Sequence, residues 1–176
     1  MLEPKKIVVT GAPSTGKTSL IQRLFHTDLT CFEEGSRSII AAALKNGVEN
    51  PFLDHPLAFS EALFAHRLND YFAPKQTSIH LYDRGIHDVV AYLLHIGVEV
   101  PCGMLEDCHT FKYDTVFVLP PWEAIYTKDD ERLESFEEAQ KLHVTLQNTY
   151  AAFGMNCIEI PKGGLAEREA FIIAHL

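Results

Sequence analysis

The sequence is poor in the features that mark membrane, nucleic-acid-binding and disulfide-stabilised proteins. No apolar stretch approaches the roughly 20 residues that span a bilayer. Fifteen basic residues stand against 24 acidic ones, and the formal net charge of −9 disfavours a nucleic-acid or anionic-membrane partner. The four cysteines form no CxxC pair, and the N-terminal residues MLEPKK contain no long apolar segment of the signal-peptide type. We therefore expect a cytoplasmic protein that binds neither nucleic acid nor membrane.

Internal repeats, low-complexity segments and domain linkers are also lacking. With 176 residues the chain has the length of a single domain, which we expect to cover 1–176. A chain of this length buries about 70% of its unfolded surface, so it needs neither disulfides nor a structural metal to fold. Cys102, Cys108 and His109 have no second ligand pair, and we interpret them as packing residues.

Short apolar segments alternate with helical patterns along the chain. Apolar runs typical of buried strands occur at 7–9, 28–32, 77–82, 115–119 and 157–160. Helical spacing is expected at 20–25, 39–44, 56–72, 86–94 and 133–153 and in a last segment ending at Ile173, with an inserted loop over 46–56. Near-continuous apolar strands between helices indicate a mostly parallel sheet that is covered on both faces. The prediction is a three-layer α/β sandwich, whose strand order stays open.

The segment GAPSTGKT at 11–18 fits the phosphate-loop pattern GxxxxGK[ST]. A strand precedes it and an amphipathic helix follows, so backbone N–H groups and the positive helix end should surround phosphate oxygens. Lys17 can reach the β- and γ-phosphates, and the Thr18 hydroxyl can ligate Mg²⁺. The expected nucleotide-binding residues are Gly11, Ala12, Pro13, Ser14, Thr15, Gly16, Lys17, Thr18 and Ser19. The alternative is a plain glycine turn before a helix.

Two charged residues follow the apolar strand that ends at Tyr82. Asp83 stands where a Walker-B carboxylate would hold Mg²⁺ directly or through water, although aspartate is also favoured as a helix cap. Arg84 offers a bidentate fork for a phosphate or a carboxylate, and its alternative is a surface salt bridge.

Glu33 and Glu34 end the second predicted strand and lie close in sequence to Arg37. Because the carboxyl ends of parallel strands line the ligand crevice, these charges are expected to face a second substrate. A carboxylate there could accept the proton of an attacking hydroxyl. The alternative is a capping carboxylate for the helix that begins near Ser36.

The charged segment YTKDDER at 126–132 opens the predicted long helix. Phosphoryl-transfer enzymes exclude water and bring a cation onto the moving phosphate. Arg132 could supply that cation from a mobile lid, whereas the alternative is a solvated helix start.

Several motifs together resemble the NadR-like AAA family, which includes the kinase domain of the bifunctional bacterial NAD-biosynthesis regulator. They are the loop GAPSTGKT, EGSR at 34–37, YDRG at 82–85, LPPW at 119–122, DER at 130–132 and IP at 160–161. The resemblance covers nearly the whole chain and implies a nucleoside-kinase-like P-loop fold with a helical lid. It further implies that Glu34 and Arg37 lie near the acceptor, that Asp83 and Arg84 lie at the cleft, and that Arg132 lies on the lid.

Two functions from different classes fit these residues. The first is a small-molecule, nucleoside-like kinase that moves the γ-phosphoryl group of MgATP to an unidentified acceptor hydroxyl. Its catalytic residues would be Lys17, Glu34, Asp83, Arg84 and Arg132, with Glu34 or Asp83 as the base and with Glu34, Arg37 and Arg84 on the acceptor. The second is a regulatory NTPase that slowly hydrolyses ATP or GTP and binds a partner.

The paired arginines favour the kinase over the regulatory NTPase. The sequence has no NKxD-like guanine reader, so we expect ATP rather than GTP. It also shows neither the second region of homology nor the helical domain of ring-forming ATPases, and a ring motor is not expected. Sequence alone names no acceptor.

Overall fold

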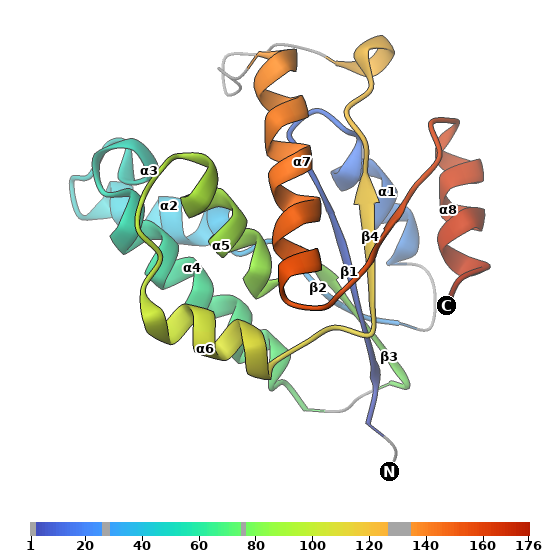
Figure 1. Cartoon of the computed structure of the whole chain (residues 1–176), viewed down its shortest axis with the longest axis horizontal. Coiled ribbons are helices and arrows are strands. Elements are labelled where there is room, and N and C mark those ends of the chain that lie inside the picture. The colour runs from blue at the N-terminus through green and yellow to red at the C-terminus, as the bar shows by residue number, and fades with distance from the viewer. Residues whose placement is uncertain (1–2, 26–28, 75–76, 127–134) are drawn as a thin grey trace.

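The computed structural model of the chain describes residues 3–25, 29–74, 77–126 and 135–176. Within these residues five strands form one parallel sheet in the order β2-β3-β1-β4-β5 (Figure 1). The strands are β1 (Lys5–Gly11), β2 (Thr30–Phe32), β3 (Ile79–Asp83), β4 (Thr115–Leu119) and β5 (Cys157–Glu159). The helices are α1 (Lys17–Leu24), α2 (Ser36–Lys45), α3 (Pro51–Asp54), α4 (Pro56–Tyr71), α5 (Ile86–His95), α6 (Cys102–Thr110), α7 (Phe136–Ala152) and α8 (Leu165–Ile173), with a short 3-10 helix η1 (Glu123–Ile125).

The central strand β1 sets the position of the site. In the sheet register Val9 of β1 lies beside Asp83 of β3 on one side and Phe117 of β4 on the other. The chain leaves β1 for α1 and leaves β3 for α5, and these two helices pack on opposite faces of the sheet. Two neighbouring strand ends therefore diverge, and such a divergence opens a ligand crevice at the carboxyl edge of a parallel sheet.

The sheet is covered on both faces because successive side chains of a strand point in opposite directions. In β1, Ile7 and Val9 pack with residues of α1 and α8, whereas Val8 packs with residues of α4 to α7. All three side chains are fully buried. This arrangement confirms the three-layer α/β sandwich (Figure 1).

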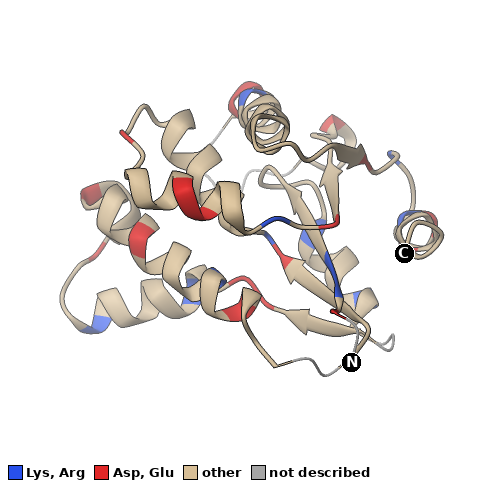
Figure 2. Cartoon of the chain, turned by 60° about the horizontal axis from the view of Figure 1, so that its bottom comes forward, with Lys and Arg blue, Asp and Glu red and all other residues tan. Residues whose placement is uncertain are grey.

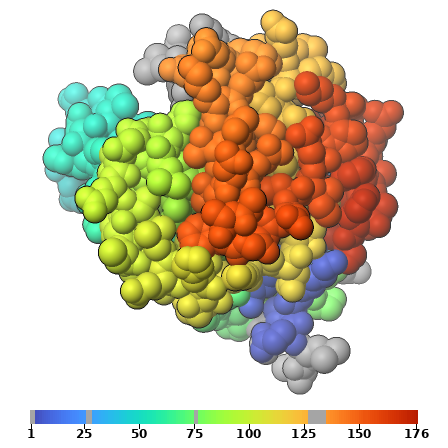
Figure 3. All heavy atoms as spheres, viewed as in Figure 1, coloured from blue at the N-terminus to red at the C-terminus, as the bar shows by residue number. Residues whose placement is uncertain are grey.

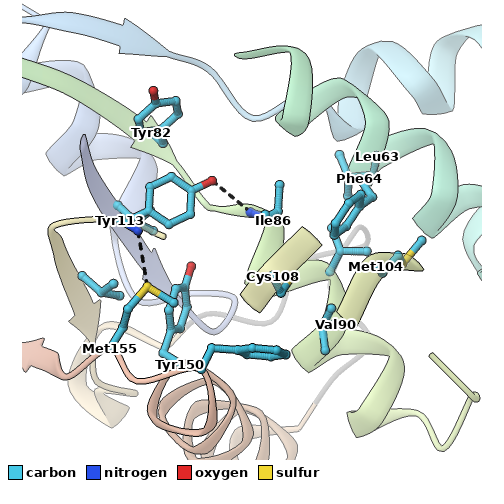
Figure 4. Close-up of a cluster of buried hydrophobic side chains, with 14 of the residues drawn as sticks. Leu63, Phe64, Tyr82, Ile86, Val90, Met104, Cys108, Tyr113, Tyr150 and Met155 are labelled. Carbon is cyan, nitrogen blue, oxygen red and sulfur yellow. Dashed lines mark hydrogen bonds between the residues drawn. The ribbon is translucent and has the colours of Figure 1, made fainter. Parts of the chain in front are cut away.

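The two cores on either side of the sheet differ in composition. The α1/α8 core consists of ten buried apolar residues, Ile7, Val9, Leu20, Ile21, Leu24, Leu81, Phe117, Leu119, Ile160 and Ile172. The α5/α7 core is larger and contains the buried tyrosines Tyr82, Tyr113 and Tyr150 (Figure 4). In the space-filling view α7 and the segment after it lie between α5 and α6 on one side and α8 on the other (Figure 3).

Several helix boundaries differ from the predicted ones. A short helix, α3, lies inside the expected loop at 46–56, where Pro51 occupies its first turn. Helix α6 was not predicted, because only Met104 and Cys108 of its residues are buried and such a pair leaves almost no periodic signal. Helix α7 begins at Phe136, with Ser135 and Glu138 forming a capping box.

Two expectations about side chains also need correction. The helical spacing expected at 56–72 counts Phe72 as its last apolar position, but that side chain is 60% exposed, and Arg67 is buried with the apolar residues of α4. Cys108 is a buried packing residue as expected and the exposed His109 still packs its ring against Phe153, whereas Cys102 is exposed. Among the described residues no group of three or more His, Cys, Asp or Glu side chains could hold a metal ion.

Charged residues are dispersed over the helices and strand ends in the ribbon view (Figure 2). None of the helices in the described ranges combines the length and the apolar character needed to cross a membrane.

Candidate active site

The phosphate loop follows β1 without interruption and passes very close to β4. A Cβ atom on Gly11 would lie 2.9 Å from the carbonyl oxygen of Leu119, so only glycine allows this approach. Gly16 has a φ of 78° and is the N-cap of α1, and in the described structure no side chain caps that helix. The N–H groups of its first turn therefore stay available for an anion.

Two side chains hold the loop from within the protein. The Thr15 hydroxyl donates to the carbonyl oxygen of Ala12 at 2.9 Å. The Arg168 guanidinium, reaching over from α8, donates through Nη2 to the carbonyl oxygen of Thr15 at 2.9 Å. Both hydrogen bonds are buried, and they hold the loop to the protein interior and to α8.

A cavity of about 640 Å³ opens above the loop. It is lined by Pro13, Ser14, Thr15, Gly16, Lys17, Thr18, Ser19, Glu34, Arg37, Arg84, Trp122, Ile125, Gly163, Gly164, Leu165 and Arg168. Seven of the nine expected nucleotide-binding residues thus face it, while Gly11 and Ala12 lie buried below. We call this space the loop cavity.

Lys17 lies at the bottom of the loop cavity between two carboxylates. Its Nζ is 3.3 Å from Oε2 of Glu34 and also contacts Oδ1 of Asp83. Asp83 ends β3 beside Val9, which places its carboxylate next to the loop. Neither carboxylate caps a helix, because the N-caps of α2 and α5 are Gly35 and Gly85, so the capping alternatives are wrong.

Arg84 occupies an unusual backbone conformation for a residue with a side chain. Its φ is 71°, and such left-handed residues cost about 1–3 kcal/mol and gather at functional sites. Nε lies 3.1 Å from Oε1 of Glu34, and Nη1 lies 3.5 Å from Oδ1 of Asp88. The side chain is only 17% exposed, so Arg84 forms an interior ion pair rather than the surface salt bridge considered above.

The ionisation of Glu34 and Arg84 is coupled. Burial alone would raise the pKa of Glu34, but the positive charges of Arg84, Lys17 and Arg67 outweigh it and lower the pKa to about 2. Burial would lower the pKa of Arg84, but Glu34, Asp88 and Asp83 together raise it. Both groups are therefore charged at neutral pH.

A second cavity of about 230 Å³ adjoins the first. The two cavities share Pro13, Glu34 and Arg84 in their walls. The remaining wall of the second, which we call the inner cavity, consists of Ser36, Ile40, Phe52, Phe59, Ser60, Leu63, Arg67, Asp88, Val89, Tyr92 and Leu142. Most of these residues are apolar or aromatic, and the charged ones, Arg67 and Asp88, line the inner cavity alone.

Two of the other predicted site residues are placed away from the inner cavity. Arg37 is exposed and lines the loop cavity, although the resemblance implied a position near the acceptor. Glu33 is exposed and is not among the residues that line either cavity. Arg132 and the lid predicted for it lie outside the described residues.

Three buried charged residues of the site escaped the sequence analysis. Arg67 donates to the carbonyl oxygen of Gly85 at 3.1 Å and lies 3.9 Å from Glu34. Its signal was its spacing, because it falls four residues after Leu63 in the buried stripe of α4. Asp88 had the weaker signal of standing one helical turn after Arg84, and Arg168 had none.

These features define a P-loop protein with the charged ends of β2 and β3 gathered around its lysine. A family model described as an AAA domain matches residues 6–168, and the chain belongs to this family. The recognition of a NadR-like AAA domain is confirmed at this level. No curated protein matches the sequence significantly.

Solved structures of kinases are similar in fold. Deoxyadenosine kinase from M. mycoides with bound dATP gives a TM-score of 0.68 at 12% identity, covering 97% of this chain and 98% of that chain. The same enzyme with the products dCMP and a flexible dCDP gives 0.67 at 12% identity, with 97% of each chain covered. NadR protein in complex with NR gives 0.63 at 21% identity, covering 98% of this chain and 50% of that chain. At these identities the likeness establishes the fold.

Proposed function

We propose that the chain is a single-domain, cytoplasmic small-molecule kinase that transfers the γ-phosphoryl group of MgATP to a hydroxyl of an acceptor. The observation that carries the proposal is the pair of adjoining cavities with Glu34 and Arg84 in their common wall. Hydrolysis needs a phosphate site and a water molecule, whereas transfer needs a second site of molecular size. The inner cavity supplies such a site, with apolar walls that suit an organic acceptor.

The loop cavity is assigned to the triphosphate. Its first-turn N–H groups lack a side-chain cap, and Lys17 adds a positive charge below them, so the donors present fit phosphate oxygens. Gly11, Ala12, Pro13, Ser14, Thr15, Gly16, Lys17, Thr18 and Ser19 form this binding loop. ATP is preferred to GTP because no guanine-reading motif occurs in the sequence.

Glu34 is assigned to the acceptor hydroxyl. Its carboxylate borders both cavities, so it can accept a hydrogen bond from a hydroxyl that faces the loop. A pKa of about 2 makes it a weak base, but phosphoryl transfer passes through a loose transition state in which the acceptor needs little deprotonation. When phosphate oxygens engage Lys17, one of the charges that lowers this pKa is drawn away, and Glu34 becomes more basic.

Arg84 is assigned to the charge that moves during transfer, because it borders both cavities and stays protonated. Arg132 is proposed as a second cation on a lid. Arg37, in the wall of the loop cavity, is proposed to contact the phosphate end of the bound substrates.

Asp83 and Thr18 are proposed to hold Mg²⁺. A carboxylate and a hydroxyl oxygen are hard ligands of the kind that Mg²⁺ takes beside waters and phosphate oxygens, so the two side chains fit this ion. The ion would neutralise charge on the transferring phosphate.

The kinases with a similar fold support a nucleoside-like acceptor. One was solved with dATP and another, NadR, with NR. The aromatic side chains Phe52, Phe59 and Tyr92 of the inner cavity provide surfaces on which a flat ring can stack.

The test is a screen of nucleosides, vitamin-like ribosides and small alcohols for ADP release that depends on the acceptor. We expect one class of acceptor to raise ADP release well above the rate with water alone. The control is Lys17→Ala, which removes the loop charge and should weaken ATP binding by about 10²-fold while the protein stays folded. ADP release that no acceptor changes would favour the regulatory NTPase instead.

A further inference from the structure

We propose that Asp88 is the positioning residue of the transfer reaction, fixing the Arg84 guanidinium between the two cavities. The proposal rests on the kinase function above. According to the proposal, this buried carboxylate raises the catalytic rate through its contact with Arg84 and does not touch the phosphates.

Asp88 contacts four residues from three parts of the chain. Its Oδ1 accepts a hydrogen bond from the Thr10 hydroxyl at the end of β1 and lies 3.5 Å from Nη1 of Arg84. Its Oδ2 accepts from the Gly85 N–H at 2.8 Å and from the Tyr150 hydroxyl at 2.5 Å. Three neutral donors therefore fix the position of the Asp88 carboxylate. The carboxylate in turn orients its one charged neighbour, the Arg84 guanidinium.

The anchoring is more extensive than capping α5 requires. A capping box needs only the bond between the Asp88 carboxylate and the Gly85 N–H. Thr10 and Tyr150 are fully buried and come from β1 and α7, so they connect α5 to the strand that feeds the loop and to the long helix. Asp88 itself is 4% exposed, and a carboxylate buried to this degree costs free energy unless it is paired.

Arg84 needs support because its left-handed backbone conformation costs free energy and persists only where the surrounding structure holds it. Glu34 holds Nε in the wall that both cavities share, and Asp88, which lines the inner cavity alone, holds Nη1. If acceptor binding engages Glu34, Asp88 is the carboxylate that keeps the guanidinium in place. The Arg84 guanidinium then keeps its orientation while Glu34 turns to the acceptor.

The surroundings of Gly85 show how closely this point is packed. A Cβ on Gly85 would lie 2.7 Å from the ring of Tyr113 and 2.8 Å from the hydroxyl of Tyr150. The Tyr113 oxygen accepts from the Ile86 N–H at 3.1 Å, at the same helix start (Figure 4). Tyr113 thus offers a matched control, since it supports the beginning of α5 through a bond that does not involve Asp88.

The variant Asp88→Asn keeps the size of the side chain and one acceptor oxygen but removes the charge that orients Arg84. We expect kcat to fall by about 10- to 100-fold, the range in which precise positioning of a charged group acts. The Kd for ATP should stay within about twofold. In the control Tyr113→Phe, one buried hydrogen bond is lost, so unfolding should become easier by about 1 kcal/mol while kcat stays within about twofold.

A double-mutant cycle with Arg84→Ala decides whether Asp88 acts through Arg84. The account predicts that Arg84→Ala and the double variant have the same kcat, because without the guanidinium there is nothing left to position. Losses that multiply would overturn the positioning role while leaving the kinase proposal intact. A wild-type protein that transfers no phosphoryl group to any acceptor would overturn both.

Discussion

The two cores on either side of the sheet do different work. Apart from Lys17 and Arg168, which lie at the phosphate loop, helices α1 and α8 bury only apolar residues, whereas the α5/α7 side also buries Arg67, His87 and Asp88. Burial of apolar surface stabilises both, so stability does not require the polar groups. Arg67 and Asp88 line the inner cavity, so this side holds the proposed acceptor site, while the α1/α8 side carries the phosphate loop and its Lys17 and Arg168 line the loop cavity.

The boundary between the two sides lies in the phosphate loop. Arg168 belongs to α8, yet its guanidinium reaches Thr15 in the loop. On the other side Asp88 reaches Thr10 just before the loop. The loop is therefore held from both faces of the sheet. Substitutions on the two faces should separate effects on the stability of the fold from effects on the rate of phosphoryl transfer.

The largest effect on kcat is expected from a residue that acts on the transferring phosphate and does not stabilise the fold. If Arg132 meets only the transferring phosphate, Arg132→Ala should lower kcat by about 10³-fold, as for other arginines in phosphoryl transfer. The nucleotide Kd and the thermal midpoint should change little. Steady-state kinetics with calorimetric titration of ATP measure both, and a near-normal kcat would show that Arg132 does not act on the transferring phosphate.

The second effect concerns the cost of burying polar groups on the α5/α7 side. His87 is fully buried, its Nε2 donates to the carbonyl oxygen of Cys108 at 3.0 Å, and burial lowers its pKa to about 4. Between about pH 6.5 and pH 4, His87 therefore binds a proton in the unfolded chain but not in the native protein. The free energy of unfolding should fall by up to about 3 kcal/mol across this window.

Urea unfolding at a series of pH values measures this slope. His87→Gln should flatten the slope between pH 6.5 and 4, whereas the exposed His55 provides the control, His55→Gln, with an unchanged slope. An equal slope in wild type and His87→Gln would show that His87 is not the group responsible.

A third effect tests the metal assignment at the edge where both sides meet. Asp83→Asn keeps the size of the side chain but removes the charge, so the Mg²⁺ concentration for half-maximal activity should rise by about 10-fold or more. Nucleotide affinity should change much less. Activity is compared across a Mg²⁺ titration, and a variant that matches wild type at low Mg²⁺ would leave Asp83 only as the partner of Lys17.

The smallest effect belongs to the apolar side. Ile172→Val removes one methylene group from the α1/α8 core and should lower the free energy of unfolding by about 1 kcal/mol. The kcat of the folded protein should stay at the wild-type value, because Ile172 lines neither cavity. A changed kcat at equal folded fraction would break the division of labour between the two sides.

The sequence predicted the parts of the site that depend on local pattern. The phosphate loop is contiguous, and Asp83 and Arg84 follow an apolar strand, so position along the chain was enough to find them. Arg168 and Asp88 could not be found in this way, because their contacts with Thr15 and Thr10 span 153 and 78 residues. Strand order was unreadable for the same reason, since only packing brings β3 and β4 to either side of β1.

The most direct test of the account follows the γ-phosphate itself. With ATP labelled in that group, the wild-type protein and the best acceptor from the screen should place most of the label on the acceptor and little in inorganic phosphate. Lys17→Ala should place label on neither. Label that appears only as inorganic phosphate, at a rate that the acceptor does not change, would contradict the assignment of the inner cavity to a phosphoryl acceptor.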